Sequence, residues 1–416
     1  MKIKDVVTLV TQSISPEPDT KYHLYSLPSY DENQTREEVF GSEIQSNKYF
    51  VPNRCILFNK LNVRFKRIWA IDNHDDNKLC STEFLPLVVD ESKVDFNYCL
   101  YLLQSESITD YLCGQNANTS GSHKRIDPQD FLDISIHLPQ LEEQKRIGNL
   151  LASIDAKIRL NRAINRNLEA LAKQLYDYWF VQFDFPNKGG KPYKTCGGKM
   201  VWSEKLKHEI PALWQIVSVN DIAELFRGVS YTKEDLVDES LGVLVLRGNN
   251  IQENQLIYDS NVAYIPQSFV STEQRICKGE IIMTMSSGSK EHVGKCVLFH
   301  HDTCETYGAF LTKFSPHSHC SYLLYEVFNS AYFKAKIKSI ASGTGINNLT
   351  NQTFDNIYIA LPPTEILKEF DKVQHKIFSE VGVLQQDTWH LIKQRDELLP
   401  LLMNGQVSLN SCCLSI

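Results

Sequence analysis

Two long stretches of the chain repeat apolar residues with heptad spacing. The first has one row at Ile147, Ile154, Asn161, Leu168 and Leu175, and an interleaved row at Leu151, Ile158, Asn165, Ala172 and Trp179. The second has rows at Phe370, Ile377, Leu384, Leu391 and Leu398, and at Leu367, Gln374, Val381, Thr388, Arg395 and Leu402. This spacing is typical of helices that pair along a seam. We therefore predict long helices over 138–182 and 361–407, each of which needs a partner helix.

The ends and the polar seam positions of these helices carry further signals. Glu142 suits a helix N-terminus, and Asn404-Gly405 suits a C-cap. Asn161 and Asn165 lie in the seam, and two explanations for them stay open. They fix the register of the pairing, or the helices separate there and leave both side chains in water.

The heptad stretches occupy equivalent places in an internal repeat. Leu138-Pro139 aligns with Leu361-Pro362, and the same offset aligns Ile126 with Leu349. Each half has a loop of small residues (118–122 and 341–345), a short alternating strand and Leu-Pro before the helix. This pattern indicates an internal duplication of globular regions 1–137 and 211–360, with a linker at 183–210 and a tail at 408–416.

The globular regions have the pattern of mixed α/β modules. The predicted strands are 54–58, 242–246, 281–285 and 296–299, and the predicted helices are 98–112 and 322–337. The predicted fold class is α+β, with two α/β modules joined by two long helices and related by the internal repeat. The module sequences differ far more than the helices do, which favours recognition over catalysis.

The composition is that of an ordinary globular protein. The chain has 416 residues, 42% of them hydrophobic and 22% charged, with a net charge of −7. This acidic balance argues mildly against nucleic-acid binding, because such domains are usually basic. The eleven cysteines are scattered, and neither a secretion signal nor a membrane-spanning run is evident. We therefore expect a cytoplasmic protein with reduced thiols.

Each module contains polar segments suited to DNA contacts. In the first module, cations interleaved with Phe65 and Trp69 suit phosphate contacts, and in the second a Ser/His/Lys segment lies at the matching place. The small-residue loops could approach phosphates with their backbone N–H groups. The candidate DNA-binding residues are Lys60, Arg64, Lys66, Arg67, Ser120, Ser122, Lys124, Arg125, Ser287, Ser289, Lys290, His292, Lys295, Thr344 and Asn347. Solvated surface, a flexible hairpin and ordinary connecting loops remain the alternatives.

Signals for catalysis or metal binding are weak. The segment 288–295 resembles a P-loop but has one residue too many and ends before Cys296 instead of Ser or Thr. His301, Cys304, His317 and Cys320 have zinc-like spacing, yet an expected single strand over 304–314 would separate the two pairs. Neither a methyl-donor loop nor a nuclease carboxylate cluster is evident. We expect no cofactor, no metal and no catalytic activity.

Several stretches together carry a family resemblance. They are 138–147 with its long helix, the linker segment 179–202 with Trp179-Phe180 and Phe185-Pro186, and the segments 342–349 and 359–363. On these residues, the chain resembles the specificity (S) subunit of type I DNA restriction–modification systems. The resemblance covers the whole chain and is weakest inside the modules. One departure is the polar trio Gln374, Thr388 and Arg395 in the second seam, which leaves the mode of helix pairing open.

The resemblance implies a function and partners. The modules would be target recognition domains that each read half of a bipartite site on double-stranded DNA, and the helices would be an antiparallel ruler between them. Two modification subunits, which methylate adenine, and two restriction subunits, which translocate DNA and cleave it, would be the partners. The acidic balance would then mean that the chain borrows electrostatic affinity for DNA from these partners. The alternative from another class is a stand-alone DNA methyltransferase or nuclease with degenerate motifs.

Overall fold

The chain forms two compact units. The computed structural model describes residues 1–115, 124–252, 254–258, 262–288, 291–341 and 347–409. Unit 1 consists of Met1–Leu160 and Thr388–Ile416, and unit 2 consists of Asn161–Asp387. None of the helices in the described part of the chain combines the length and the apolar composition that a membrane span requires.

Unit 1 contains two sheets and a set of short helices. The antiparallel four-stranded sheet has the order β1 (Val7–Leu9), β9 (Phe84–Val89), β6 (Arg54–Asn59), β7 (Ile68–Asp72). The five-stranded sheet has the order β2 (Ser13–Ile14), β5 (Lys48–Phe50), β8 (Lys78–Cys80), β3 (Lys21–Tyr25), β4 (Glu37–Phe40), with β3 and β8 parallel. The short helices are α1 (Leu27–Asn33), α2 (Phe96–Gln104), α3 (Glu106–Gln115) and α4 (Pro128–Leu132).

The core of unit 1 joins the four-stranded sheet to helices from both ends of the unit's sequence. Phe58 and Leu87 of the sheet belong to one buried cluster with Tyr98 of α2. Ile147 and Leu402, from the two long helices, are buried in the same cluster. Each such side chain contributes about 1.5–3 kcal/mol by leaving water. The two separate segments of unit 1 are therefore held together by shared apolar burial.

Unit 2 contains a four-stranded sheet, a three-stranded sheet and several two-stranded pairs. Its antiparallel four-stranded sheet has the order β13 (Ala223–Arg227), β22 (Leu311–Pro316), β18 (Ile281–Thr284), β20 (Cys296–Leu298). Its three-stranded sheet has the order β17 (Ala263–Ile265), β14 (Val243–Leu246), β21 (Thr306–Tyr307), with β14 and β21 parallel. The two-stranded pairs are β10 (Met200–Ser203) with β11 (His208–Pro211), β12 (Gln215–Ser218) with β24 (Tyr358–Leu361), β15 (Ile251–Gln252) with β16 (Gln255–Leu256), and β19 (Ser286–Ser287) with β23 (Asn347–Asn348).

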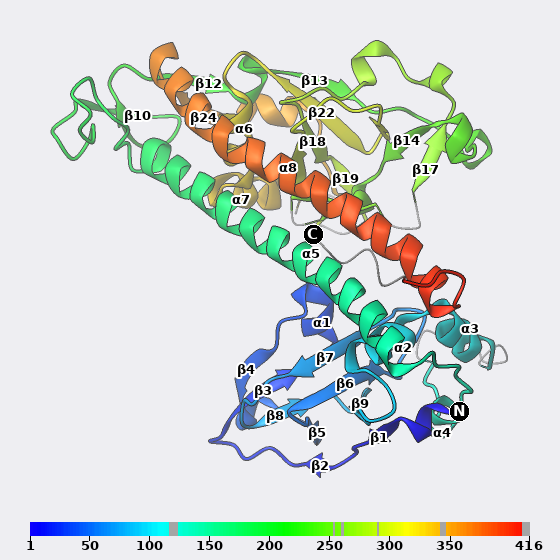
Figure 1. Cartoon of the computed structure of the whole chain (residues 1–416). Helices are drawn as coiled ribbons and strands as arrows, with labels where there is room; N and C mark the ends of the chain where they lie inside the picture. Colours follow the sequence, from blue (N-terminus) through cyan, green and yellow to red (C-terminus); the bar gives the residue numbers. More distant parts are fainter. Residues whose placement is uncertain (116–123, 253, 259–261, 289–290, 342–346, 410–416) are drawn as a thin grey trace. The chain divides into compact units, whose positions relative to one another are not determined.

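The repeat in the sequence has a counterpart in the topology of each unit. The order β1-β9-β6-β7 matches β13-β22-β18-β20, and the order β4-β3-β8 matches β17-β14-β21. Each unit then continues into two short helices, α2 and α3 in unit 1, and α6 (Ser321–Asn329) and α7 (Ala331–Ala341) in unit 2 (Figure 1). The predicted strands β6, β14, β18 and β20 are thereby confirmed.

Two predictions inside the modules are wrong in detail. Each predicted single helix is two helices, because Ser105 and Ser330 adopt extended backbone and their hydroxyls donate to Leu102 and Val327 carbonyls. The predicted single strand over 304–314 is also wrong. It is interrupted between β21 and β22, where Gly308 donates to the Leu246 carbonyl and accepts from the Leu311 N–H.

The segment expected to be a linker packs into unit 2. Phe183, Phe185 and Trp214 are buried in its large cluster, and the Trp214 ring lies 5.4 Å and 5.2 Å from the two phenylalanine rings, centroid to centroid. The strands β10 and β11 form a hairpin within the same stretch. The connection is therefore a folded part of the unit.

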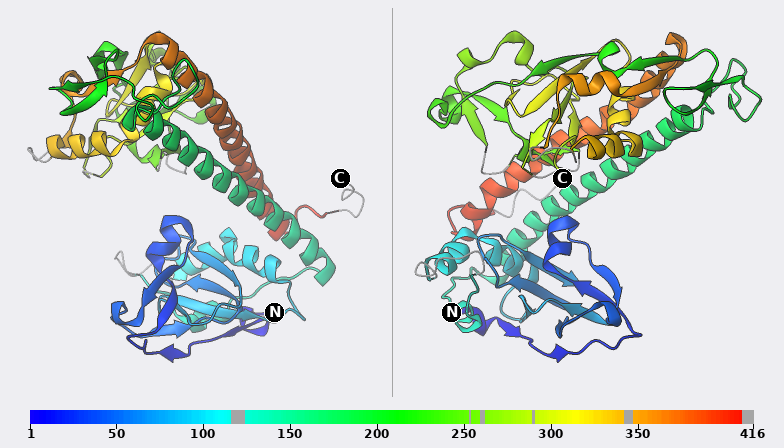
Figure 2. Two further views of the ribbon diagram at one scale, coloured as in Figure 1. Left: turned by 90° about the vertical axis from the view of Figure 1, so that its left-hand side faces the viewer. Right: turned by 180° about the vertical axis from the view of Figure 1, so that it is seen from behind.

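The two predicted long helices are confirmed (Figures 1 and 2). They are α5 (Leu141–Tyr176, 36 residues), green in the figures, and α8 (Thr364–Met403, 40 residues), orange to red. The helix α5 is followed by a π-helical turn over Asp177–Val181, and α8 is followed by Gly405 at φ +65°, as expected for a C-cap. The helix α8 starts later than predicted because Pro362 and Pro363 favour extended backbone in the residues before them.

Within unit 1, the start of α5 pairs antiparallel with the end of α8. Arg395 Nη1 lies 3.0 Å from Asp155 Oδ1 across the pair, and Tyr101 of α2 donates its hydroxyl to Asp155 Oδ2 at 2.7 Å. The polar Arg395 in the second seam thus has a carboxylate partner. Leu398 and Leu402 join the same cluster as Ile147, which lies about two turns before Asp155 on α5.

Within unit 2, the end of α5 pairs antiparallel with the start of α8. Asn161 Nδ2 donates to Asp387 Oδ2 at 2.8 Å, and Gln374 Nε2 donates to the Ala172 carbonyl at 2.9 Å. Asn161 and Asn165 are 4% and 2% exposed. The explanation that water surrounds these two asparagines is therefore wrong, and the contact of Asn161 supports a role in register.

The predicted pairing residues lie at varied depth along the helices. Ile147, Phe370, Ile377 and Leu391 are buried, whereas Ile154, Leu168, Leu175, Leu384 and Leu398 are half-buried. Leu168 and Leu175 pack against the cluster that contains Phe370 and Ile377.

Candidate nucleic-acid interface

The basic segment of unit 1 is the connection between β6 and β7. Its residues 60–67 form a turn that the surrounding structure holds in several places. Asn62 has φ +55°, the Phe65 N–H donates to the Asn62 carbonyl at 3.0 Å, and the Asn59 side chain bonds both the N–H and the carbonyl of Leu61. Tyr30 donates its hydroxyl to the Lys66 carbonyl at 3.2 Å. The turn is therefore firmly braced.

The cations of this turn differ in their surroundings. Arg64 and Lys66 are exposed, Lys60 is half-buried, and Arg64 and Lys66 form no ion pair among the residues that the structure describes. Arg67 instead makes a bidentate pair with Asp31, Nε to Oδ1 and Nη2 to Oδ2 at 2.7 Å each. The hydrogen bond that Arg67 donates to Asp31 raises the pKa of the Arg67 guanidinium. Arg67 therefore braces the turn, while Lys60, Arg64 and Lys66 are available to face phosphates.

A second predicted segment lies against the first. The Asn62 N–H donates to the Lys124 carbonyl at 2.7 Å, and the Ile126 N–H donates to the Lys60 carbonyl at 3.0 Å. Arg125 forms a bidentate pair with Glu83, which raises the pKa of the guanidinium. The structure thus brings 60–62 and 124–126 to one edge. Ser120 and Ser122 lie outside the described residues.

Unit 2 presents its predicted segment in the same arrangement. Ser287 pairs with Asn347 where β19 meets β23, and Lys295 Nζ lies 3.2 Å from Nδ1 of His292. His292 is exposed and Lys295 is half-buried. The predicted residues Ser289, Lys290 and Thr344 lie outside the described residues.

Three backbone hydrogen bonds are equivalent in the two edges. In the first, the N–H of Asn59 donates to the Arg67 carbonyl in unit 1, and the N–H of Thr284 donates to the Lys295 carbonyl in unit 2. In the second, the N–H of Lys60 donates to the Glu83 carbonyl, and the N–H of Met285 donates to the Phe310 carbonyl. In the third, the N–H of Ile126 donates to the Lys60 carbonyl, and the N–H of Leu349 donates to the Met285 carbonyl. We call these two regions hairpin edge 1 (residues 59–67, 83 and 124–126) and hairpin edge 2 (residues 284–288, 291–295, 310 and 347–349).

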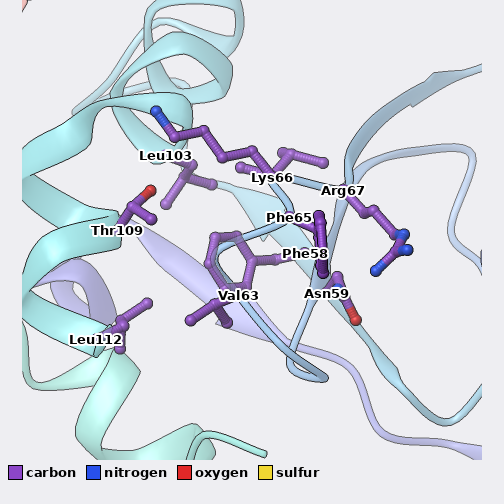
Figure 3. A pocket seen from close by; sticks show the side chains of 10 residues that line it. Phe58, Asn59, Val63, Phe65, Lys66, Arg67, Leu103, Thr109 and Leu112 are labelled. Carbon is purple, nitrogen blue, oxygen red and sulfur yellow. The ribbon is translucent and has the colours of Figure 1, made fainter. Parts of the chain in front are cut away.

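A small, shallow hollow adjoins hairpin edge 1. Figure 3 shows Phe65 beside Phe58, with Val63 near both. Lys66 extends toward Leu103 of α2 and Thr109 of α3, and Arg67 points the opposite way. Its lining combines apolar side chains with the polar residues Asn59, Lys66, Arg67 and Thr109, and it has room for little more than a water molecule.

Nothing in the described residues supports a metal centre. No three His, Cys, Asp or Glu side chains gather within the described ranges in a way that could hold an ion. The neighbouring carboxylates of Asp90 and Glu91 have cationic partners, since Asp90 pairs with Lys93 and Glu91 with Arg54.

Comparison with known proteins identifies the family. The model of the "Type I restriction modification DNA specificity domain" matches residues 1–170 and 211–400. The chain belongs to this family. The resemblance found in the sequence is thereby confirmed, and the two matched segments show that the specificity domain occurs twice.

Curated specificity subunits are similar to this chain over much of its length. The HindI specificity subunit of Haemophilus influenzae is 25% identical over 402 residues, covering 85% of this chain and 86% of that protein. The MjaIX specificity subunit of Methanocaldococcus jannaschii is 22% identical over 343 residues, covering 80% and 73%. The EcoKI specificity subunit of Escherichia coli is 30% identical over 213 residues, covering 48% and 44%.

A solved specificity subunit shares the fold. The type I restriction–modification S subunit from M. genitalium has a TM-score of 0.56 with this chain at 14% identity, covering 97% of this chain and 95% of that one. The two-domain fold of type I specificity subunits is therefore also the fold of this chain.

Sequence reasoning missed several residues in or beside the hairpin edges of this specificity chain. Asp31 and Glu83 neutralise two predicted arginines, and both are distant from them in the sequence. Phe310 is 70% exposed next to β19, and no pattern in its surroundings marks it. The Asn59 side chain is the one signal that could have been read, because an asparagine at a strand end commonly shapes a turn.

Proposed function

We propose that this chain is the DNA sequence-specificity subunit of a type I restriction–modification complex, and that each unit reads one half of a bipartite target. The observation that carries this proposal is the equivalence of hairpin edges 1 and 2 in a chain of the specificity-domain family. The major groove of DNA admits a two-stranded β-ribbon, and cations beside such a ribbon bind phosphates.

The long helices would set the distance between the half-sites. In this proposal, residues 1–137 and 211–360 are the recognition domains, related by a pseudo-twofold repeat. The helical segments 138–182 and 361–407 form one antiparallel coiled coil, and 183–210 connects the halves. The antiparallel pairing of α5 and α8 inside each unit supports this arrangement. Half-sites about one helical turn apart would present the same groove face to both domains.

The chemistry would come from other subunits. Two modification subunits would dock on the helices and methylate adenine, and two restriction subunits would add translocation and cleavage. Exposed apolar side chains on α5, such as Leu171 at 45%, are consistent with a docking face. The chain itself would be non-catalytic and would hold no cofactor. Its net charge of −7 fits a subunit that gains affinity for DNA from its partners.

Methylome sequencing tests the proposal. Cells with and without this chain should differ by methylated adenines in one bipartite motif. Replacing the whole segment 60–67, which includes Phe65, should change recognition of one half-site only, and Lys188→Ala in the exposed connection is the control. A change in both half-sites would contradict the division into two reading units. Methyl transfer by the purified chain alone would favour the stand-alone methyltransferase instead.

A further inference from the structure

An exposed aromatic ring stands at the tip of hairpin edge 1. Phe65 is 49% exposed, although large apolar side chains usually leave water. The guanidinium carbons of Arg64 and Arg67 lie over its ring, 4.8 Å and 5.3 Å from the centroid. Cation–π contacts of this kind hold a ring in place at an exposed site. Phe65 is therefore an oriented apolar group among cations.

The backbone that carries Phe65 is fixed before any partner binds. The Arg67 N–H donates to the Phe65 carbonyl at 2.7 Å, and Arg67 is itself clamped by Asp31. The preceding turn is tied at Asn62 to the Lys124 carbonyl. A pre-organised group loses little conformational entropy when it makes a contact. An exposed ring on such a turn is thus suited to recognition.

We propose that Phe65 makes an apolar contact with the 5-methyl group of a thymine in the half-site read by unit 1. This inference rests on the proposed function and names a base contact within it. The 5-methyl group is the apolar mark of thymine in the major groove, and phenylalanine is among the side chains that contact it. The cations Lys60, Arg64 and Lys66 of the same turn complement the phosphates that line the groove.

Edge-on contact fits the ring better than insertion between base pairs. An intercalating wedge presents its faces to the bases that it separates. Guanidinium groups already lie over the Phe65 ring, so insertion would have to displace them. The ring edge can reach a methyl group while Arg64 and Arg67 keep their positions.

Thymine-to-deoxyuridine replacement tests this contact, because it removes only the methyl group. The chain would be co-purified with its modification subunit, and its target taken from methylome sequencing. Each thymine of the first half-site would be replaced singly, and dissociation constants measured by fluorescence anisotropy. One replacement should weaken binding by the wild type roughly four-fold, as expected for one buried methyl group. Phe65→Ala should weaken binding to the thymine duplex and remove the difference between the two duplexes.

Phe40→Ala is the matched control. Phe40 is 50% exposed on β4 of the same unit, away from residues 59–67 in the sequence. This variant should keep the full preference for thymine, and Phe65→Leu should keep part of it. Folding of each variant would be checked by circular dichroism, and an exposed side chain should leave it intact.

Several outcomes would overturn the contact. The first is a thymine preference that survives Phe65→Ala. The second is a first half-site that contains no thymine, or in which no thymine replacement weakens binding. The third is unstacking of a 2-aminopurine probe in the duplex that depends on Phe65, because unstacking would indicate insertion of the ring between base pairs. Failure of the wild-type complex to bind its methylome-derived target would instead count against the proposed function itself.

Discussion

The contact between Asp155 and its two partners offers a direct test of how the long helices are held in unit 1. Asp155 of α5 accepts from Arg395 of α8 at 3.0 Å and from the Tyr101 hydroxyl of α2 at 2.7 Å. Burial raises the pKa of Tyr101, so its hydroxyl stays protonated as a donor. The change Asp155→Ala removes the shared acceptor and leaves both donors behind.

The expected cost follows from the burial of the donors. Tyr101 is 1% exposed, and a buried donor without an acceptor costs about 1–3 kcal/mol. The Arg395 and Asp155 side chains are 29% and 18% exposed, and Arg395 keeps Asp396 as a partner, so the ionic part is smaller than in a fully buried pair. We expect a loss of about 2 kcal/mol in the free energy of unfolding of unit 1. Calorimetry should show a melting transition lowered by about 4–8 °C.

An exposed ion pair on α8, the helix that carries Arg395, supplies the control. Lys393 and Glu397 lie 4.0 Å apart with side chains 59% and 65% exposed. Glu397→Ala should therefore change stability by less than about 0.5 kcal/mol. Tyr101→Phe combined with Asp155→Ala should cost less than the sum of the single changes, because they share one contact. Equal melting temperatures for Asp155→Ala and Glu397→Ala would refute the reasoning.

Three further changes test other parts of the molecule. Arg64→Ala or Lys66→Ala should weaken DNA binding by the assembled complex for all sequences alike and lower the salt slope of log K by about 1, and an unchanged slope would show that they face no phosphate. Burial raises the pKa of the Glu326 carboxyl from 4.5 to about 8. The folded state thus holds this proton more tightly, and unit 2 should lose up to about 5 kcal/mol as pH rises from about 4.5 to 8. Glu326→Gln should flatten that dependence in unfolding experiments at pH 5.5 and 8.5, whereas an equal slope would place the cause elsewhere. Leu168→Asp or Leu391→Asp should put a charge into the helix pairing and reduce assembly with partner subunits, and unchanged sedimentation would reject the paired seam.

The long-range pattern of the sequence predicted the architecture well because periodicity reports burial directly. A heptad row such as Phe370, Ile377 and Leu391 predicts which face of a helix leaves water, whatever covers that face. The offset between Ile126 and Leu349 predicted an internal duplication, and these two residues make equivalent hydrogen bonds in the structure.

The candidate site could be predicted only in part. The sequence located Lys60, Arg64 and Lys66 as a basic segment, and the structure leaves Arg64 and Lys66 exposed. The sequence could not show that Arg67 and Arg125 pair with carboxylates, because Asp31 and Glu83 come close to them only when the sheets fold. A cation in a sequence has no visible partner when that partner is distant along the chain.

The sequence by itself determined two long amphipathic helices, a duplicated α/β module and the family to which the chain belongs. These features depend on local spacing, which the chain carries in any environment. Only the tertiary structure decided what the polar seam residues do and which cations remain exposed. The sequence shows only that Asn161, Gln374 and Arg395 are polar. Their roles depend on the partners that folding brings close to them, which are Asp387, Ala172 and Asp155, respectively. The physical reason is that burying a polar group is costly without a partner, and the fold alone decides whether that partner is present.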